Sequence, residues 1–155
     1  MSPAIVTRRV LLGAALGAVA TTACAQTLRA TPELVVYKSP TCGCCTAWVN
    51  HMRAAGFRAR IQEQSDLAPI RQSQGIPDAL AACHTALIGG YALEGHVPAQ
   101  DVRRLLTERP RAIGLAVPAM PPGSPGMEMP DGRKRPFETL LMLRGGGSRV
   151  FARHG

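Results

Sequence analysis

Three cysteines lie within four residues of the chain and form the group best suited to chemistry. Cys42 and Cys45 have the C-x-x-C spacing of a redox pair, and Cys44 adds a third sulfur. A helical pattern follows them, and the positive end of a helix dipole favours the thiolate, which attacks disulfides and binds metals. A plain stabilising disulfide is the alternative. Adjacent helical residues point about 100° apart, so a bond between Cys44 and Cys45 is not expected.

Further soft donors lie downstream of this cluster. Cys83-His84 adds a thiol and an imidazole, and three methionines occupy the proline-rich segment 117–130. Thiolates and imidazoles suit Cu(I) or Zn(II), and thioethers prefer Cu(I). A core histidine without a ligand role and methionines that merely cover the core remain alternatives. His51 and His154 are expected to face solvent. The candidate metal ligands are Cys42, Cys44, Cys45, Cys83, His84, His96, Met120, Met127 and Met129.

The elements that would position these donors follow from hydrophobic periodicity. Residues 34–37 form a β-rich run, residues 46–55 repeat apolar positions at helical spacing, and residues 57–62 alternate as an edge strand would. A short helix is expected from Asp66 to Gln74. The next elements are a hairpin, 85–88 and 91–94, a helix over 99–108, and a closing hairpin, 139–143 and 149–152.

This order, a βαβ unit followed by a ββα unit, predicts an α/β fold of the thioredoxin-like class with a mixed sheet. In that fold a cis-proline precedes the third strand and packs against the redox pair. Here Cys83-His84 occupies that place. The substitution would bring a fourth sulfur and an imidazole close to the cysteine cluster.

The first 25 residues predict a signal peptide. Arg8-Arg9 precedes an apolar run, 10–20, that is too short to span a bilayer of about 30 Å hydrocarbon thickness. Ala23-Cys24-Ala25 supplies the small-x-small cleavage pattern, which leaves residues 26–155 as the domain. The arginine pair favours the Tat route over the Sec route, and export places the protein in the periplasm. A lipid anchor at Cys24 is a weaker alternative.

Length and composition exclude several classes. A chain of 155 residues supports one domain, and 46% hydrophobic with 18% charged residues does not fit a disordered polyelectrolyte. The formal charge of +8 falls to +6 without Arg8 and Arg9. The arginines are scattered and few aromatics lie among them, so nucleic-acid binding is not expected. Paired carboxylates, a phosphate loop and a Ser-His-Asp pattern are missing, so no hydrolase is predicted.

Several motifs together resemble the bacterial domain-of-unknown-function family 411 over about residues 33–153. They are Cys42-Gly-Cys-Cys45 with Trp48, Ala82-Cys-His-Thr-Ala86, Gly89-Gly-Tyr91, Glu94-Gly-His-Val-Pro98, Leu105-Leu106, Gly114-Leu-Ala-Val-Pro118 and Met120-Pro121 to Gly123-Ser-Pro-Gly-Met127. The resemblance implies a thioredoxin-like fold, export, metal handling and an association with copper resistance. One departure is Ala119, where the family pattern tends to have glycine.

The leading hypothesis is therefore an exported Cu(I)-binding protein that sequesters copper or passes it to another periplasmic copper protein or an efflux component. The rival is a thiol-disulfide oxidoreductase in which Cys42 attacks and Cys45 resolves. A structural zinc domain is a third reading. Cys44 separates the first two, because a redox pair has no need of a third sulfur. Apart from its signal, the chain is not expected to insert into a membrane.

Overall fold

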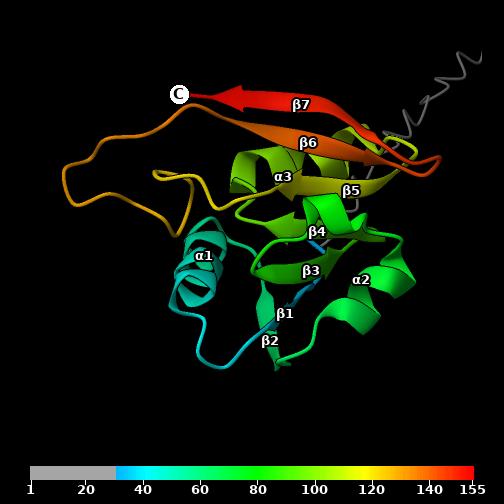
Figure 1. The fold of residues 1–155 in the computed structure, drawn as a ribbon, viewed down its shortest axis with the longest axis horizontal. Coiled ribbons are helices and arrows are strands. Elements are labelled where there is room, and N and C mark those ends of the chain that lie inside the picture. The colour runs from blue at the N-terminus through cyan, green and yellow to red at the C-terminus, as the bar shows by residue number, and fades with distance from the viewer. Residues whose placement is uncertain (1–30) are drawn as a thin grey trace, which may run out of the picture.

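A computed structural model describes residues 31–155 as one mixed seven-stranded sheet with helices on both faces (Figure 1). The predicted signal peptide, residues 1–25, lies outside the described residues. The strands are β1 (Leu34–Lys38), β2 (Ala59–Glu63), β3 (His84–Ile88), β4 (Tyr91–Gly95), β5 (Ala112–Val117), β6 (Phe137–Leu143) and β7 (Ser148–His154). The helices are α1 (Gly43–Ala54), α2 (Ala68–Gln74) and α3 (Ala99–Glu108), with a 3-10 turn at Asp78–Leu80. Within this described part, no helix is both long and apolar enough to cross a membrane.

The first half of the sheet confirms the predicted thioredoxin-like fold. The strand order is β2-β1-β3-β4, with β1 parallel to β2 and antiparallel to β3, and with β3 and β4 joined as a hairpin. β2 lies at the sheet edge, as its alternating pattern predicted. α1 begins three residues earlier than its periodicity indicated, so the cysteine cluster forms its first turn.

The second half contains a strand that the sequence pattern did not reveal. β5 pairs in parallel with β4 through the α3 crossover, and the predicted C-terminal hairpin, β6 and β7, extends the sheet beyond it. β5 has an irregular register at Gly114, where a Cβ would collide with the backbone of Ala92. Only glycine allows this close approach, and a glycine within an apolar run weakens a strand signal.

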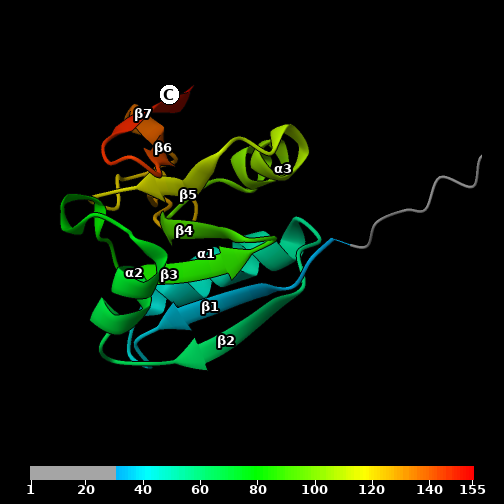
Figure 2. The same ribbon diagram turned by 90° about the vertical axis from the view of Figure 1, so that its right-hand side faces the viewer.

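The core lies on both faces of the sheet. α1 and α3 cover one face, where Trp48, Met52 and Val102 are fully buried, and α2 lies on the opposite face (Figures 1 and 2). The Trp48 indole Nε1 donates a hydrogen bond of 2.9 Å to the Val97 carbonyl oxygen. This bond links α1 to the loop before α3, so the helix that carries the cysteines is fixed to the sheet.

His154 does not face solvent as predicted. Its Nε2 lies 2.8 Å from the Asp101 carboxylate, which also accepts a 2.6 Å hydrogen bond from the Thr139 hydroxyl. Asp101 and Thr139 are buried. The C-terminal strand is therefore attached to the first turn of α3, and a contact between residues so distant in sequence leaves no local pattern.

The predicted proline-rich loop has neither helix nor strand between β5 and β6 and runs beside α1 (Figure 1). Ala119 and Met120 both have left-handed backbone angles, with φ of 64° and 43°. Non-glycine residues adopt this region at a cost because the Cβ crowds the following carbonyl. The family resemblance marked this same position as one that favours glycine.

Replacing Ala119 by glycine is expected to raise the free energy of unfolding by about 1 kcal/mol, because glycine adopts positive φ without that crowding. Urea denaturation measures the change. Ala81→Gly is the matched control, since Ala81 has φ −59° and ψ 136°, which any residue can adopt. That substitution should be destabilising, because it only adds freedom to the unfolded chain. A loss of stability in Ala119→Gly equal to that in the control would contradict the prediction.

Candidate metal centre

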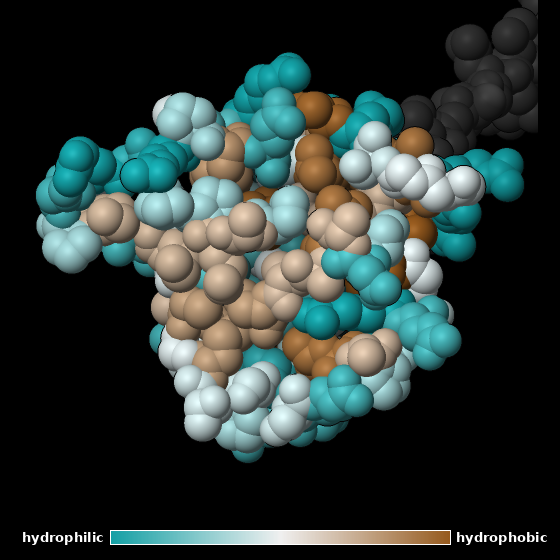
Figure 3. All heavy atoms as spheres, viewed as in Figure 1, coloured by the Kyte–Doolittle hydropathy of each residue, from teal (hydrophilic) through white to brown (hydrophobic). Residues whose placement is uncertain are grey.

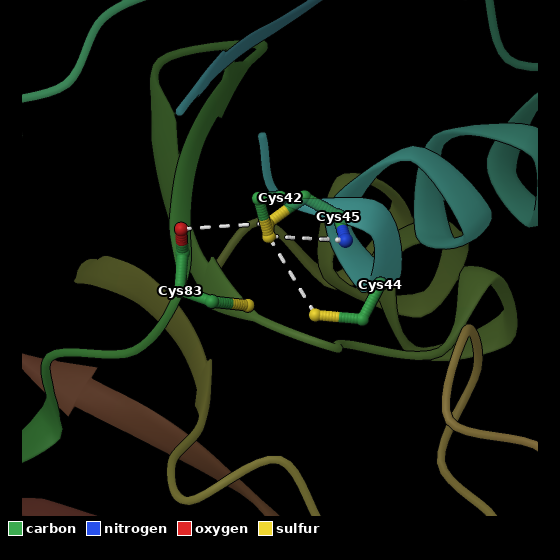
Figure 4. A group of neighbouring side chains, drawn as sticks. All are labelled: Cys42, Cys44, Cys45 and Cys83. Atoms are coloured by element: carbon green, nitrogen blue, oxygen red, sulfur yellow. Dashed lines mark hydrogen bonds between the residues drawn. A yellow bond between two sulfur atoms is a disulfide. The ribbon is translucent and has the colours of Figure 1, made fainter. Parts of the chain in front are cut away.

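The first turn of α1 presents three cysteines in different states (Figure 4). Cys42 is the N-cap residue, and its Sγ accepts a hydrogen bond of 3.3 Å from the Cys45 backbone N–H. Cys42 and Cys45 form a disulfide, whereas Cys44 is free and half-buried. The Sγ atoms of Cys42 and Cys44 are 3.6 Å apart. The turn therefore carries a disulfide with a free thiol beside it.

Cys83 brings the fourth sulfur to this turn from the residue before β3. The side chains of Cys83 and Cys44 point into the same space between the strand and the helix (Figure 4). The Cys45 Sγ lies 3.5 Å from the Cys83 carbonyl oxygen, and all four Sγ atoms lie within 4.8 Å of one another. No peptide bond in residues 31–155 is cis. A thiol thus occupies the place that a cis-proline has in thioredoxins.

Two buried histidines surround Cys83 on its other side. The Cys83 Sγ lies 3.3 Å from Nδ1 of His84 and 3.1 Å from Nε2 of His96. His96 Nδ1 donates to the Pro125 carbonyl oxygen at 2.7 Å, because a carbonyl can only accept. Neutral His96 therefore has its free lone pair on Nε2, directed at the Cys83 sulfur. Cys83, His84 and His96 form a second donor group with atoms within 4.8 Å of one another.

His84 is fully buried. Its ring lies 4.3 Å from the Trp48 ring, between centroids, and its Nε2 is the one buried side-chain nitrogen or oxygen in residues 31–155 without a hydrogen-bond partner. An unpaired buried nitrogen carries a desolvation cost, whereas the other ring nitrogen, Nδ1, faces the Cys83 sulfur. The two donor groups, joined at Cys83, consist of sulfur and imidazole nitrogen only. This set fits Cu(I) or Zn(II).

Burial governs the protonation of this site. Burial, followed by the neighbouring Cys44 sulfur, raises the pKa of the Cys83 thiol to about 12. Burial, followed by the charge of His96, lowers the pKa of His84 to about 3, and burial also lowers the pKa of His96. At neutral pH the metal-free site therefore has neutral imidazoles and a protonated Cys83, so a metal ion must displace a thiol proton.

The low pKa of His84 predicts a loss of stability in acid. The unfolded imidazole takes up a proton below pH 6.5, whereas the folded one resists it until about pH 3. Stability should therefore fall as pH decreases below 6.5, by about 1.4 kcal/mol per pH unit from this group. Urea unfolding at pH 7, 6 and 5 measures it. His84→Phe keeps a ring against Trp48 without a titrating nitrogen, and an identical pH profile for the two proteins would contradict the assignment.

The proline-rich loop comes close to α1 at Gly126. A Cβ on Gly126 would lie 2.9 Å from the Cys44 carbonyl oxygen and 2.7 Å from the Trp48 backbone nitrogen, so only glycine lets the loop approach this closely. Met127 follows directly and is half-buried. Met120 and Met129 are 36% and 38% exposed. The three predicted methionines thus occupy one loop, of which the part next to Met127 lies against the cysteine-bearing turn.

His51 belongs to neither donor group. It is half-buried rather than solvent-facing, and its Nε2 accepts a hydrogen bond of 3.3 Å from the Ala99 backbone N–H.

Sequence reasoning also missed an ion pair beneath the site. Arg71 Nε donates to the Glu94 carboxylate at 2.9 Å, and Glu94 is fully buried. Burial raises the pKa of Glu94, and its hydrogen-bond donors, Arg71 among them, oppose that rise. The available signal was an acidic residue at the end of an otherwise apolar strand.

Comparison with known proteins places this site in a family. A family model described as "Protein of unknown function, DUF411" matches residues 80–127, a range that includes Cys83, His84 and His96. Curated proteins give no match. Among solved structures, "Copper resistance protein copG- Form 1" has 38% identity and a TM-score of 0.74, covering 80% of this chain and 98% of that chain. Form 2 of that protein has 37% identity and a TM-score of 0.75, covering 81% and 99%. Identity at this level over nearly the whole of the relative shows that the chain belongs to the family of the copper resistance protein CopG, and the DUF411 model matches the part of the chain that carries the second donor group.

Proposed function

We propose that the protein is an exported Cu(I)-binding protein that acts in copper resistance by sequestering the ion or passing it to another protein. The observation that carries the proposal is the meeting of four cysteine sulfurs and two buried imidazoles around Cys83. The relatives' name, copper resistance protein, supports copper as the metal. Soft sulfur donors favour Cu(I) over hard cations such as Mg²⁺ or Ca²⁺.

The proposed ligand set depends on the oxidation state of the cluster. With Cys42 and Cys45 joined, the available donors are the Cys44 and Cys83 thiols with His84 and His96. Reduction adds two further thiols at the same turn, where the helix dipole favours their thiolates. The reduced site is therefore proposed as the copper-holding form. Zn(II) also accepts thiolate and imidazole ligands, so a zinc titration belongs beside that with copper.

The loop methionines are proposed to assist the entry and exit of copper. Met120 and Met129 are the large hydrophobic side chains exposed in residues 31–155. Figure 3 shows weakly apolar side chains gathered over α1 and this loop, on the side of the molecule that carries the cysteines. A thioether is a weak, uncharged Cu(I) ligand that resists oxidation better than a thiol in the periplasm, which suits short-lived binding during transfer between proteins.

Anaerobic titration of the reduced full chain with Cu(I), against a competing chelator, tests the proposal. Binding tighter than about micromolar, weakened by both Cys44→Ser and Cys83→Ser, is expected from a thiolate site. His51→Gln is the matched control, because this histidine contacts the Ala99 backbone outside both donor groups. Weaker binding in the wild-type chain, or binding indifferent to both cysteine changes, would contradict the proposal.

A second candidate is thiol-disulfide exchange, favoured by the Cys42–Cys45 disulfide at the N-terminus of α1. In this reaction the Cys42 thiolate attacks a substrate disulfide and one substrate thiol leaves. Cys45 then attacks the mixed disulfide, releasing the second substrate thiol and leaving the disulfide in the protein. Catalysed insulin reduction with glutathione as reductant measures it. Turnover that is lost in Cys42→Ser and kept in Cys83→Ser would favour this reaction over copper binding.

A further inference from the structure

A buried ion pair contacts the backbone segment that contains Cys83. Glu94 of β4 is fully buried, and Arg71 of α2 reaches it from the opposite face of the sheet to α1. Arg71 Nε donates to Glu94 Oε1 at 2.9 Å. α2 buries no side chain completely, so this pair is a principal link between the helix and the sheet.

The pair holds both backbone polar groups of the residue before Cys83. The Ala82 N–H donates to Glu94 Oε1 at 2.7 Å, and Arg71 Nη2 donates to the Ala82 carbonyl oxygen. Glu94 binds the N–H of Ala82, Arg71 binds its carbonyl oxygen, and the two charged side chains also bind each other. The peptide planes on both sides of Ala82 are therefore fixed. The start of the Cys83 backbone is therefore held in one orientation.

The same carboxylate holds the residue after His84. The Thr85 hydroxyl donates to Glu94 Oε2 at 2.6 Å, and Thr85 and Glu94 are cross-strand partners in the β3–β4 ladder. Cys83 and His84 thus lie between two residues, Ala82 and Thr85, bound to the two oxygens of one carboxylate. A shift of either ligand candidate requires breaking a buried, charge-assisted hydrogen bond.

The neighbouring glycine makes this arrangement compact. A Cβ on Gly95, which has φ 71°, would lie 2.8 Å from the Ala82 Cβ and would collide with the Val117 carbonyl oxygen. His96 follows one residue later. The end of β4 therefore bears the carboxylate that fixes Cys83 and His84 and the glycine that admits Ala82, and the next residue, His96, is the third member of their donor group.

Stability alone is a weak reason for such a pair. A buried ion pair recovers little more than its own desolvation cost, and apolar residues of similar size often serve as well. We infer that Glu94 and Arg71 are positioning residues, which hold Cys83 and His84 in the arrangement that binds a soft metal ion. This inference rests on the proposed function. Loss of residues that orient metal ligands typically costs about 10-fold to 100-fold in affinity.

The test compares Glu94→Gln and Arg71→Met with Asp101→Asn, which alters the buried Asp101–His154 pair at α3 instead. Cu(I) affinity of the reduced full chain is measured by chelator competition. A second readout needs no copper: the rate at which iodoacetamide alkylates Cys83, followed on its own peptide by mass spectrometry. Urea unfolding of each variant confirms that it is folded under the conditions used.

The expected result is a loss of Cu(I) affinity of about 10-fold or more in both variants. Alkylation of Cys83 should become about tenfold faster, because a thiol that is no longer held in its half-buried position is more accessible to the reagent. Asp101→Asn should change neither the Cu(I) affinity nor the alkylation rate of Cys83, even if its free energy of unfolding falls as far as that of the other two variants. Arg71→Lys keeps the charge but can make only one of the two contacts, so it should fall between wild type and Arg71→Met. If Glu94→Gln does not fold, Arg71→Lys and Arg71→Met decide the question.

Unchanged affinity and unchanged alkylation in folded Glu94 and Arg71 variants would overturn the inference, as would equal changes in Asp101→Asn. A wild-type chain that binds no Cu(I) would instead refute the proposed function. In that case, faster alkylation in the two variants and not in the control would still support the positioning of Cys83, and unchanged alkylation would overturn it.

Discussion

Cys83→Ser is expected to weaken Cu(I) binding by the reduced chain at least about 100-fold, more than loss of an orienting residue costs. Cys83 is the one residue shared by the two donor groups, and its sulfur lies 3.1 Å from His96 Nε2 and 3.3 Å from His84 Nδ1. Serine is nearly isosteric, but its hydroxyl is a hard, weakly acidic donor that binds Cu(I) poorly. Anaerobic chelator competition measures the change.

A pH series separates a lost ligand from a distorted site. Because the pKa of Cys83 is about 12, copper must displace its proton, and the apparent affinity should rise about tenfold per pH unit for that proton. The lowered pKa values of His84 and His96 leave both imidazoles neutral, so they release none near pH 7. In Cys83→Ser the slope of log affinity against pH should therefore fall by about one. A slope equal to that of the wild type would show that Cys83 is not a ligand.

Oxidation of the Cys42–Cys45 pair is the second change with a large expected effect. The disulfide removes two of the four clustered sulfurs as thiolate donors, so the oxidised chain should bind Cu(I) about 100-fold more weakly than the reduced chain, or bind fewer ions. Chelator competition before and after treatment with a phosphine reductant, which is removed by gel filtration before Cu(I) is added, measures the difference.

The double variant Cys42→Ser/Cys45→Ser provides the matched control for this comparison. It keeps Cys44, Cys83 and both histidines but cannot form the disulfide. Its Cu(I) affinity should be low and should not respond to reductant. Equal binding by the oxidised and reduced wild-type chains would contradict the proposed role of the pair and would leave Cys44, Cys83 and the histidines as the whole site.

The elements nearest the site could be predicted because their signals are local. The cysteine spacing, the helical stripe of Trp48 and Met52, and the glycine pair between β3 and β4 each fix structure within a few residues. The strand–helix–strand order then indicated that Cys83-His84 would stand opposite the cysteine turn. The structure places it there, with the Cys83 carbonyl oxygen 3.5 Å from the Cys45 Sγ.

What the sequence did not reveal depends on contacts between distant segments. β5 was missed because Gly114, required by the close approach of Ala92, weakens its strand pattern. His154 was expected to be exposed because nothing near it in sequence indicates Asp101 as its partner. The Arg71–Glu94 pair joins a helix and a strand 23 residues apart. Each of these interactions becomes visible only when the sheet is assembled.

Copper K-edge X-ray absorption of the reduced full chain, loaded anaerobically with Cu(I), tests the central claim most directly, because it reports the atoms bound to the ion. A site built from Cys44, Cys83 and the reduced Cys42–Cys45 pair predicts a first shell dominated by sulfur, which loses sulfur in Cys83→Ser. A first shell of nitrogen and oxygen without sulfur, or a sulfur shell unchanged in Cys83→Ser, would contradict it.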